Sequence, residues 1–216
     1  MKKKKKVLIA LGFLVLFALW TAAISLIDVQ PIGPGGSTVG FATLNGFVHN
    51  ITGEHMWLYT VTDWLGLVPV GFVLGFAALG LVQWIKRKNI LKVDYSILVL
   101  GGFYVVVMAA YLFFEYVVVN YRPVLIEGVL ETSYPSSTTM LVMCVMPTAI
   151  LQLNTRIKNP VFRRCVAVSI VAFVAFMVVG RLVSGVHWLT DIIGGALFSA
   201  GLVMMYDSML GEKNNE

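Results

Sequence analysis

Four ionisable residues in the second half of the chain have the types and spacing of a site that binds an anion: Arg122, Arg181, His187 and Asp191. Because His187 and Asp191 are four residues apart, we expect them to share one face at a helix start, where the carboxylate would orient the imidazole. Guanidinium groups offer the charged, forked hydrogen bonds that suit phosphate oxygens. The set predicts a phosphoryl site. A snorkelling arginine and a purely structural His–Asp contact are the simpler alternatives.

The segment from Tyr134 to Thr139 predicts a helix start close to these residues. A proline followed by Ser136 and Ser137 is typical of a helix N-terminus, where side-chain oxygens cap free backbone N–H groups. The same N–H groups and the helix dipole favour an anion. A helix cap alone is common, so this signal gains weight only beside the arginines and the histidine. We therefore predict that Ser136 and Ser137 bind phosphate together with Arg122 and Arg181.

The composition indicates a membrane protein rather than a soluble one. Of 216 residues, 58% are hydrophobic and 12% are charged, and the mean hydropathy is +0.85. A soluble domain would be about half apolar and about a quarter charged. The basic pI near 9.2 does not indicate a nucleic-acid partner, because the basic residues lie in short loops between apolar runs. The cysteines, Cys144 and Cys165, form no zinc-binding pattern and are predicted to be packing residues.

The apolar blocks are about 20 residues long, which is the length of a membrane-crossing helix. We predict an all-α, polytopic membrane protein, a six-transmembrane-helix bundle that forms a single domain over residues 1–216. The predicted spans are residues 7–27, 65–85, 95–119, 136–153, 165–184 and 189–210. Residues 28–64 form a predicted extracytoplasmic loop with short interfacial helices at residues 41–47 and 55–57. The first run is longer than a signal-peptide core, so we expect an uncleaved span, with cleavage after Ala23 left open.

The distribution of lysine and arginine predicts the orientation of the bundle. Five of the 16 are at residues 2–6, four at residues 86–92, four at residues 156–164 and one at position 213. With six spans, these 14 lie on one side, which the positive-inside tendency assigns to the cytoplasm together with both termini. The other two, Arg122 and Arg181, fall at the opposite face, where the positive-inside tendency does not account for them. The phosphoryl site is therefore predicted at the outer face of the cell membrane.

Three short motifs resemble the signatures of one family. The pattern R-x5-H-x3-D from Arg181 to Asp191 resembles the third signature of the type 2 phosphatidic acid phosphatase superfamily, the lipid phosphate phosphatases. The R-P pair at Arg122 resembles the end of the first signature, K-x6-R-P. The P-S-S-T run from Pro135 resembles the second signature, P-S-G-H. The order of the motifs, the six-span layout and the outer location of the site also agree with this family.

The resemblance implies a two-step phosphoryl transfer on a phospholipid or polyprenyl phosphate. His187 would attack phosphorus and form a phosphohistidine, with Asp191 supporting it. Arg122, Arg181 and the amides around Ser136 would hold the phosphate oxygens, and water would then hydrolyse the intermediate. The family uses no metal and no cofactor, so none is expected here.

Two positions depart from the family pattern. Glu115 stands where the first signature has its lysine, and Thr138 stands where the second has its histidine. A missing general acid costs about 100- to 10,000-fold in rate. The loss is serious for a phosphate monoester, whose alkoxide leaving group has a conjugate acid near ~15.7. It matters less for a diphosphate, whose leaving phosphate titrates near ~6. The sequence therefore predicts a preference for a lipid diphosphate, such as a polyprenyl carrier, over phosphatidic acid.

Several alternatives stay open at this stage. Another side chain could replace the missing acid, and His55 is the leading one among the six candidates His49, His55, Tyr121, Glu127, Glu131 and Tyr134. The chain could instead be a catalytically impaired relative that binds or transports a lipid phosphate. It could also be a transferase that passes the phosphoryl group or headgroup to an acceptor other than water. The identity of the lipid and the oligomeric state are not encoded in these patterns.

Overall fold

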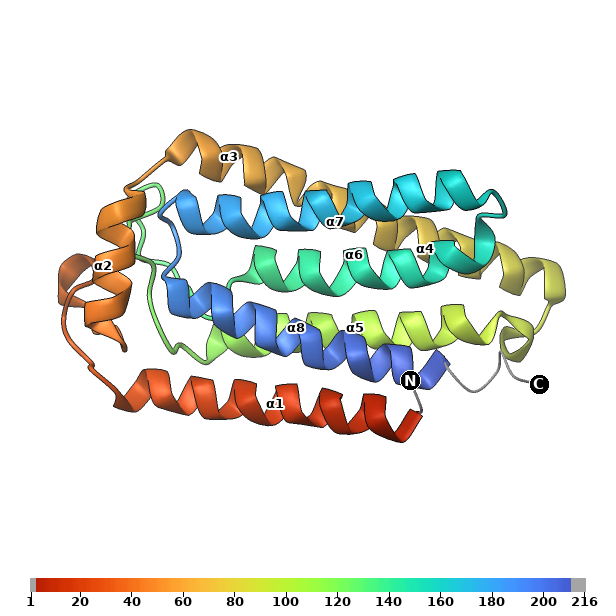
Figure 1. Cartoon of the computed structure of the whole chain (residues 1–216), viewed down its shortest axis with the longest axis horizontal. Helices are drawn as coiled ribbons and strands as arrows, with labels where there is room; N and C mark the ends of the chain where they lie inside the picture. Colours follow the sequence, from red (N-terminus) through yellow and green to blue (C-terminus); the bar gives the residue numbers. More distant parts are fainter. Residues whose placement is uncertain (1–2, 211–216) are drawn as a thin grey trace.

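The computed structural model describes residues 3–210, and within this range the chain is helical with three isolated β-bridges and no β-strand. Figure 1 shows long helices that run side by side along the longest axis of the molecule. The all-α prediction is therefore confirmed. The predicted basic residues Lys2 and Lys213 and the polar tail at residues 211–216 lie outside the described range.

Eight α-helices and two short 3-10 turns make up the described chain. They are α1 (Lys3–Leu26), η1 (Pro34–Gly36), α2 (Ala42–Thr52), α3 (Met56–Leu65), α4 (Leu67–Arg87), η2 (Ile90–Lys92), α5 (Tyr95–Tyr116), α6 (Ser137–Arg156), α7 (Pro160–Val183) and α8 (Leu189–Leu210). Six helical segments are long and apolar enough to cross a membrane: α1, α3 with α4, α5, α6, α7 and α8. The six-span prediction is confirmed, and α8 has the predicted bounds.

The second span differs from the prediction because α3 and α4 are nearly continuous. Only Gly66 separates them, and its backbone stays in the right-handed helical region. Its N–H donates to the carbonyl oxygens of Thr62 and Asp63, 3.1 and 3.0 Å away, which carries the helical hydrogen bonding across the junction. A helix does begin at Met56, next to the helix expected at residues 55–57, but it extends to Leu65 and leads into the membrane span.

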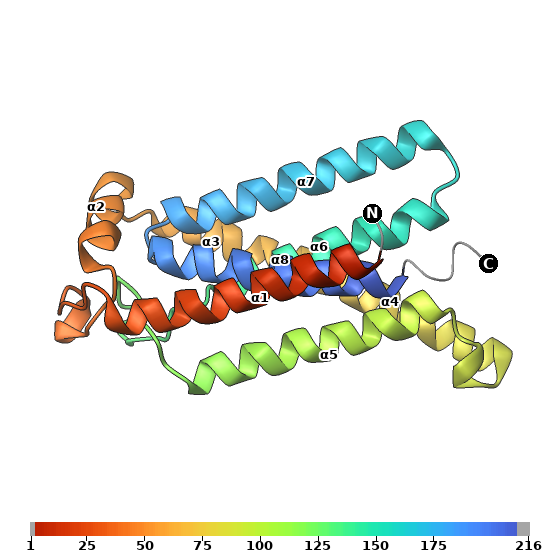
Figure 2. The same cartoon turned by 60° about the horizontal axis from the view of Figure 1, so that its bottom comes forward.

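Helices α6 and α8 form the centre of the bundle (Figures 1 and 2). Half of the apolar window of α6 and 44% of that of α8 are buried, against 11% to 22% in the other four spans. These two helices are also the least hydrophobic of the six. A helix surrounded by other helices can carry small and polar residues that pack or hydrogen-bond between helices, whereas a lipid-facing helix must stay apolar.

Close packing between α1 and α8 depends on a glycine. A Cβ atom at Gly201 would lie 2.8 Å from Leu14 Cδ2 and 3.3 Å from the carbonyl oxygen of Ala10, so a larger residue there would require Leu14 to move. Toward the end of α8, Lys6 Nζ lies 2.7 Å from Asp207 Oδ2. The start of α1 and the end of α8 therefore lie together at one end of the bundle.

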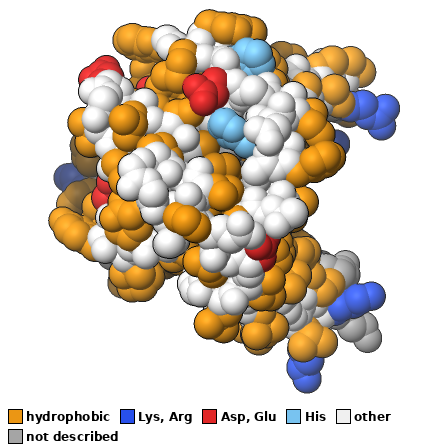
Figure 3. All heavy atoms as spheres, turned by 90° about the vertical axis from the view of Figure 1, so that its left-hand side faces the viewer, with side chains coloured by type: hydrophobic (Ala, Val, Ile, Leu, Met, Phe, Trp, Pro, Cys, Tyr) orange, Lys and Arg blue, Asp and Glu red, His pale blue; other side chains and the backbone are white. Residues whose placement is uncertain are grey.

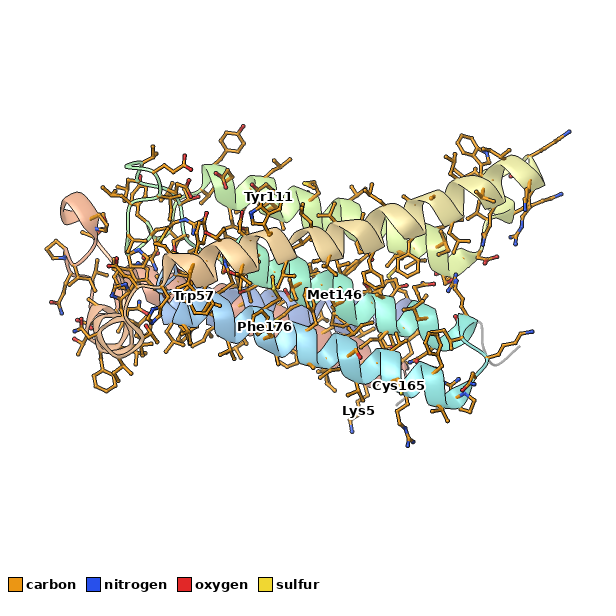
Figure 4. All side chains as sticks on the ribbon, turned by 90° about the horizontal axis from the view of Figure 1, so that it is seen from above. Lys5, Trp57, Tyr111, Met146, Cys165 and Phe176 are labelled. Atoms are coloured by element: carbon orange, nitrogen blue, oxygen red, sulfur yellow. The ribbon has the colours of Figure 1, made fainter. Side chains whose placement is uncertain are left out.

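The two ends of the bundle differ in character. The end that holds the chain's first and last described residues also carries the basic connections α4–α5 and α6–α7 (Figure 1). Figure 4 places Lys5 and Cys165 toward that end and Trp57 toward the other. The other end carries α2 and the α5–α6 and α7–α8 connections, and it is called the loop end below. The predicted site residues come from these connections and from the helix turns that flank them.

Candidate functional site

His187 lies in the tight connection between α7 and α8. The predicted shared helix face with Asp191 is wrong, because α8 begins only at Leu189 and His187 precedes it. The connection turns through Gly185, whose φ of +73° is rarely adopted by other residues. A Cβ atom there would lie 2.1 Å from the carbonyl oxygen of Gly53, so the turn is packed against the connection between α2 and α3. The turn, rather than helical spacing, sets the direction of the imidazole.

The α5–α6 connection folds back on itself and supplies the other side of the site. Isolated bridges pair Tyr121 with Thr132 and Ile126 with Val129, and a turn with positive φ at residues 127–128 closes the loop. The backbone N–H of Arg122 donates to the carbonyl oxygen of Glu131, 3.0 Å away. This pairing places the leg that carries Arg122 beside the leg that leads into α6.

Asp191 is completely buried in the first turn of α8 and accepts three hydrogen bonds. The backbone N–H of Trp188 donates to Oδ2 over 2.9 Å, as a residue near a helix start commonly reaches back to the cap. Asn120 Nδ2 donates to Oδ1 over 3.3 Å. The hydroxyl of Ser133 also donates to Oδ2. A buried carboxylate is costly without partners, and these three donors fix its position.

His187 faces a hydroxyl on one side and two arginines on the other. Its Nδ1 lies 3.2 Å from Ser133 Oγ and 3.8 Å from Asp191 Oδ2. Its Nε2 lies 3.5 Å from Arg122 Nη1 and 3.4 Å from Arg181 Nη2. Guanidinium groups only donate hydrogen bonds, so Nε2 must present its lone pair to them. Nδ1 therefore carries the proton in the neutral ring.

The surroundings of His187 hold the imidazole in its neutral form. Burial lowers the pKa of His187 well below its usual value of 6.5, and the charges of Arg122 and Arg181 lower it further. A hydrogen bond between the ring and the backbone of Ser133 raises the pKa and offsets part of this effect. A neutral ring with an unprotonated Nε2 is the form that can act as a nucleophile.

Arg122 and Arg181 bring two positive charges into a space that is nearly closed to solvent. Their exposed fractions are 8% and 1%. The ring of Tyr59 lies under both, with its centroid 6.0 Å from the guanidinium carbon of Arg122 and 4.9 Å from that of Arg181. Glu131 approaches Arg122 at 3.0 Å, and Asp63 lies 3.8 Å from Arg181. The contact with Glu131 is made by Nε of Arg122, whereas Nε of Arg181 has no hydrogen-bond acceptor among the described residues. Such a pair is suited to a multiply charged anion.

A cavity of about 420 Å³ opens beside Arg122 and His187, whereas Arg181 lies behind them and does not line it. It is lined by Tyr111, Phe114, Glu115, Arg122, Leu130, Glu131, Thr132, Ser133, Tyr134, Pro135, Ser137, Met140 and His187. A neighbouring groove of about 340 Å³ shares Tyr111, Ser137 and Met140 with it and extends between α4, α5 and α6. Figure 4 labels Tyr111 on α5 near the loop end. Figure 3 looks onto that end, where the Lys and Arg side chains in view lie at the margins.

The predicted helix start is the N-terminus of α6, where Ser136 and Ser137 lie in different surroundings. Ser136 caps α6 by accepting a hydrogen bond from the N–H of Thr139, and its own N–H donates to the Asp191 carbonyl oxygen over 3.2 Å. Ser136 is completely buried, whereas Ser137 lines the cavity. Glu115 also lines the cavity, and Thr138 lines the groove. Ser137 is therefore better placed than Ser136 to meet a ligand.

Two of the six candidate acids line the cavity. One is Glu131, which contacts Arg122. The other is Tyr134, whose hydroxyl pairs with Thr21 Oγ1 over 2.7 Å and whose pKa is raised by burial. His55, the leading candidate, does not line the cavity, and neither do His49, Tyr121 and Glu127. Thus none of the six stands out as a ready proton donor near neutral pH.

The cysteines and the acidic and histidine side chains offer no obvious metal site. Within residues 3–210, no three His, Cys, Asp or Glu side chains gather closely enough to hold a metal ion. Cys144 is buried, in keeping with a packing role, whereas Cys165 is exposed on α7. The packing prediction for Cys165 is therefore wrong, because α7 turns this position outward.

Sequence reasoning missed three residues that complete the site. Ser133 contacts both His187 and Asp191, and it lies just two residues before the P-S-S-T motif, so a longer motif would have included it. Asn120, which donates to Asp191, lies two residues before the R-P motif, so extending that motif by two residues would also have included it. Tyr59 lies far from every motif in the sequence, and no local pattern marks it.

Comparison with known proteins agrees with this architecture. The family model of the PAP2 superfamily matches residues 96–213, which is more than half of the 216 residues. A similar solved structure is the crystal structure of the first transmembrane PAP2 type phosphatidylglycerolphosphate phosphatase from Bacillus subtilis. It shares 19% sequence identity over 96% of this chain and 97% of its own, with a TM-score of 0.59, and so supports the fold. No curated protein sequence matches the chain.

We predict that inorganic phosphate stabilises the purified protein against heat. At ten times its Kd, phosphate adds about 1.4 kcal/mol and raises Tm by about 3 to 6 °C for a protein of this size. The increase should vanish in Arg122→Ala and persist in Arg164→Ala, because Arg164 is exposed on α7 outside the site. An equal increase in both variants would contradict an anion site at Arg122.

We also predict that His187 makes the folded state less stable in acid. Its pKa is lower in the folded protein, so the unfolded chain binds this proton first as pH falls below about 6.5. The free energy of unfolding should therefore decrease, by up to about 1.4 kcal/mol per pH unit. The drop in Tm between pH 7.5 and 5.5 should be smaller in His187→Gln. The same drop in both proteins would contradict a buried neutral imidazole.

Proposed function

The chain belongs to the PAP2 superfamily, and on this premise we propose that it removes phosphate from a membrane lipid through a phosphohistidine intermediate. Its six apolar helices make it a multi-pass membrane protein. The proposal rests on one observation above all. The unprotonated Nε2 of His187 lies within 3.5 Å of two buried arginines, at the wall of a cavity large enough for a lipid headgroup.

The geometry suits a two-step transfer. In the first step the Nε2 lone pair of His187 forms a bond to phosphorus, and the bond from phosphorus to the leaving oxygen breaks. Arg122 and Arg181 neutralise the charge on the phosphoryl oxygens as it develops. In the second step a water oxygen bonds to phosphorus, the N–P bond breaks, and dihydrogen phosphate leaves with both protons of the water. His187 regains its lone pair at Nε2.

The groove beside the cavity supports a lipid as the substrate. Its walls are formed by Asp63, Gly66, Val70, Val73, Tyr104, Val107, Met108, Tyr111, Ser137, Thr138, Met140, Leu141 and Val145. Most of these side chains are apolar, so a hydrocarbon chain can lie in the groove while its headgroup occupies the cavity. Residues Tyr111 and Met140 line both spaces and mark the transition between them.

Two substitutions support a diphosphate, such as a polyprenyl diphosphate, as the preferred substrate. Thr138 lines the groove beside the site and cannot donate a proton near neutral pH. A lipid phosphate departs from a diphosphate without protonation, whereas an alkoxide departs from a monoester with difficulty. The cavity also has room for a second phosphate, with Ser137 available on its wall.

The charge distribution supports an outward-facing site. The basic connections lie at one end of the bundle, and Arg122 and Arg181 lie at the other. Because basic loops stay in the cytoplasm, the loop end would face outside and act on lipids of the outer leaflet.

A second function is a lipid-phosphate binding protein without turnover. Glu115 and Thr138 favour it, since the first puts a carboxylate on the cavity wall and the second leaves the family's acid position without an acid. In such a protein the arginines would retain the ligand, and His187 would serve only as a hydrogen-bond acceptor.

We predict that the purified protein releases phosphate from polyprenyl diphosphate faster than from phosphatidic acid. Release should fall at least about 1,000-fold in His187→Ala, because the nucleophile of a covalent route is removed. The measurement is phosphate release in detergent micelles at equal lipid mole fraction. Faster cleavage of phosphatidic acid would overturn the diphosphate preference.

Other outcomes of this assay separate the rival functions. Lipid binding without phosphate release, lost in Arg122→Ala, would support the binding protein. A new phosphorylated product, formed only when a hydroxyl acceptor is added, would support a transferase. Release that persists in His187→Ala would contradict the phosphohistidine route.

We predict that an impermeant maleimide reaches the loop end from outside intact cells. In a Cys165→Ser background, Phe47→Cys on α2 should react at once, whereas Leu91→Cys in η2 should react only after permeabilisation. Both side chains are well exposed, at 63% and 83%, so reactivity reports the side of the membrane. Labelling of Leu91→Cys alone in intact cells would reverse the proposed orientation.

A further inference from the structure

We propose that Ser133 is a positioning residue that transmits the effect of Asp191 to His187. The idea builds on the proposed function, because it concerns the nucleophile of that reaction. It adds a third member between the histidine and the carboxylate: the carboxylate does not hold the imidazole directly but through the serine hydroxyl.

The distances carry this proposal. Nδ1 of His187 lies 3.2 Å from Ser133 Oγ, within hydrogen-bonding range. The same Nδ1 lies 3.8 Å from Asp191 Oδ2, which is too far for a hydrogen bond. Ser133 Oγ in turn contacts Asp191 Oδ2 directly. The hydroxyl therefore lies between the ring and the carboxylate.

The directions of the two hydrogen bonds follow from the chemistry of the groups. An ionised carboxylate only accepts, so the Ser133 hydroxyl must give its proton to Asp191. Its oxygen is then free to accept the proton of His187 Nδ1. The arginines impose the same arrangement from the opposite side of the ring, because they can only donate to Nε2. Both sides of the imidazole thus select the tautomer with a free lone pair at Nε2.

The hydrogen bond between His187 and Ser133 becomes stronger during the reaction. When Nε2 bonds to phosphorus, the ring keeps its proton at Nδ1 and acquires a formal positive charge. The Nδ1–H bond to Ser133 then becomes charge-assisted, and the Ser133 hydroxyl remains polarised by the negative Asp191. Hydrolysis returns the ring to neutrality with the proton still at Nδ1, so no proton moves along these hydrogen bonds.

The backbone holds Ser133 in place for this role. Its N–H donates to the carbonyl oxygen of Asn120 over 2.9 Å, and its side chain is 3% exposed. Asp191 already has donors from Trp188 and Asn120. The carboxylate of Asp191 would therefore keep two donors without Ser133. The Ser133 hydroxyl has a second contact, because it also lies within hydrogen-bonding distance of the His187 ring.

The test compares Ser133→Ala with Ser133→Thr in phosphate release from the better lipid substrate. Ser133→Ala should lower kcat about 10- to 100-fold with KM within about twofold, which is the loss expected when a hydrogen bond to a charged group is missing. Ser133→Thr keeps the hydroxyl and should recover most of kcat. Ser25→Ala is the matched control, since the Ser25 hydroxyl bonds only to its own helix. An unchanged kcat in Ser133→Ala would overturn the proposal.

A double variant separates transmission from an independent effect. If Asp191 acts through Ser133, Ser133→Ala combined with Asp191→Asn should be no slower than Asp191→Asn alone. Multiplied losses would show that the two residues act separately and would overturn the proposal. Retention of the phosphate-induced rise in Tm in Ser133→Ala would show that the arginine pair remains in place.

A measurement that needs no turnover decides the role of Ser133 independently. Nitrogen-15 NMR of His187, with His49→Gln and His55→Gln to remove the other histidines, should show a protonated Nδ1 and an unprotonated Nε2. Ser133→Ala should keep this tautomer, because the arginines still donate to Nε2. It should shift the Nδ1 resonance toward that of an imidazole N–H without an acceptor, and Ser133→Thr should restore the original resonance. If the protein released no phosphate, the proposed function would fail, whereas an unchanged Nδ1 resonance in Ser133→Ala would overturn this inference.

Discussion

Two guanidinium groups buried beside one imidazole impose the main constraint on this structure. Arg122 and Arg181 repel each other and lose hydration, so their burial is unfavourable unless nearby groups compensate for it. The ring of Tyr59 and the carboxylates of Glu131 and Asp63 provide part of that compensation. Burial lowers the pKa of His187, and the same two charges lower it further. Under the proposed function, an anion bound between the two arginines would supply the remaining compensation, so affinity for phosphate and readiness of the nucleophile would have one physical origin.

The scaffold meets this constraint by drawing the site from separate parts of the chain. Arg181 comes from the last turn of α7, Asp191 from the first turn of α8, and Arg122 and Ser133 from the two legs of the α5–α6 connection. The central helices α6 and α8 begin at this end and are the most buried of the spans. The loops are therefore anchored on the most buried helices of the bundle, which favours a fixed position for the charge cluster away from water.

The sequence predicted elements that depend on local pattern and missed contacts that depend on three-dimensional folding. The six spans follow from runs of apolar residues, and the cap at Ser136 follows from its neighbours. The helical reason given for the His187–Asp191 pair was wrong, because Gly185 turns the chain before α8 starts. Tyr59 could not be foreseen, since only the packing of α3 against α7 brings it under the arginines. Roles for Arg122, Arg181, Ser137, His187 and Asp191 in binding and chemistry stay predictions.

The near-continuity of α3 and α4 has a consequence for how a lipid reaches the site. At 1.5 Å per residue, α4 is about 30 Å long and already matches the hydrocarbon thickness of a bilayer. The α3 extension carries the exposed indoles of Trp57 and Trp64 near its two ends, and such side chains favour headgroup depth. Because Tyr59 and Asp63 are on this extension, the arginine pair that they contact lies beyond the end of α4. Under the proposed function, a lipid phosphate bound at that level would reach the site without leaving the bilayer, which would avoid a cost of about 0.8 kcal/mol for every methylene withdrawn.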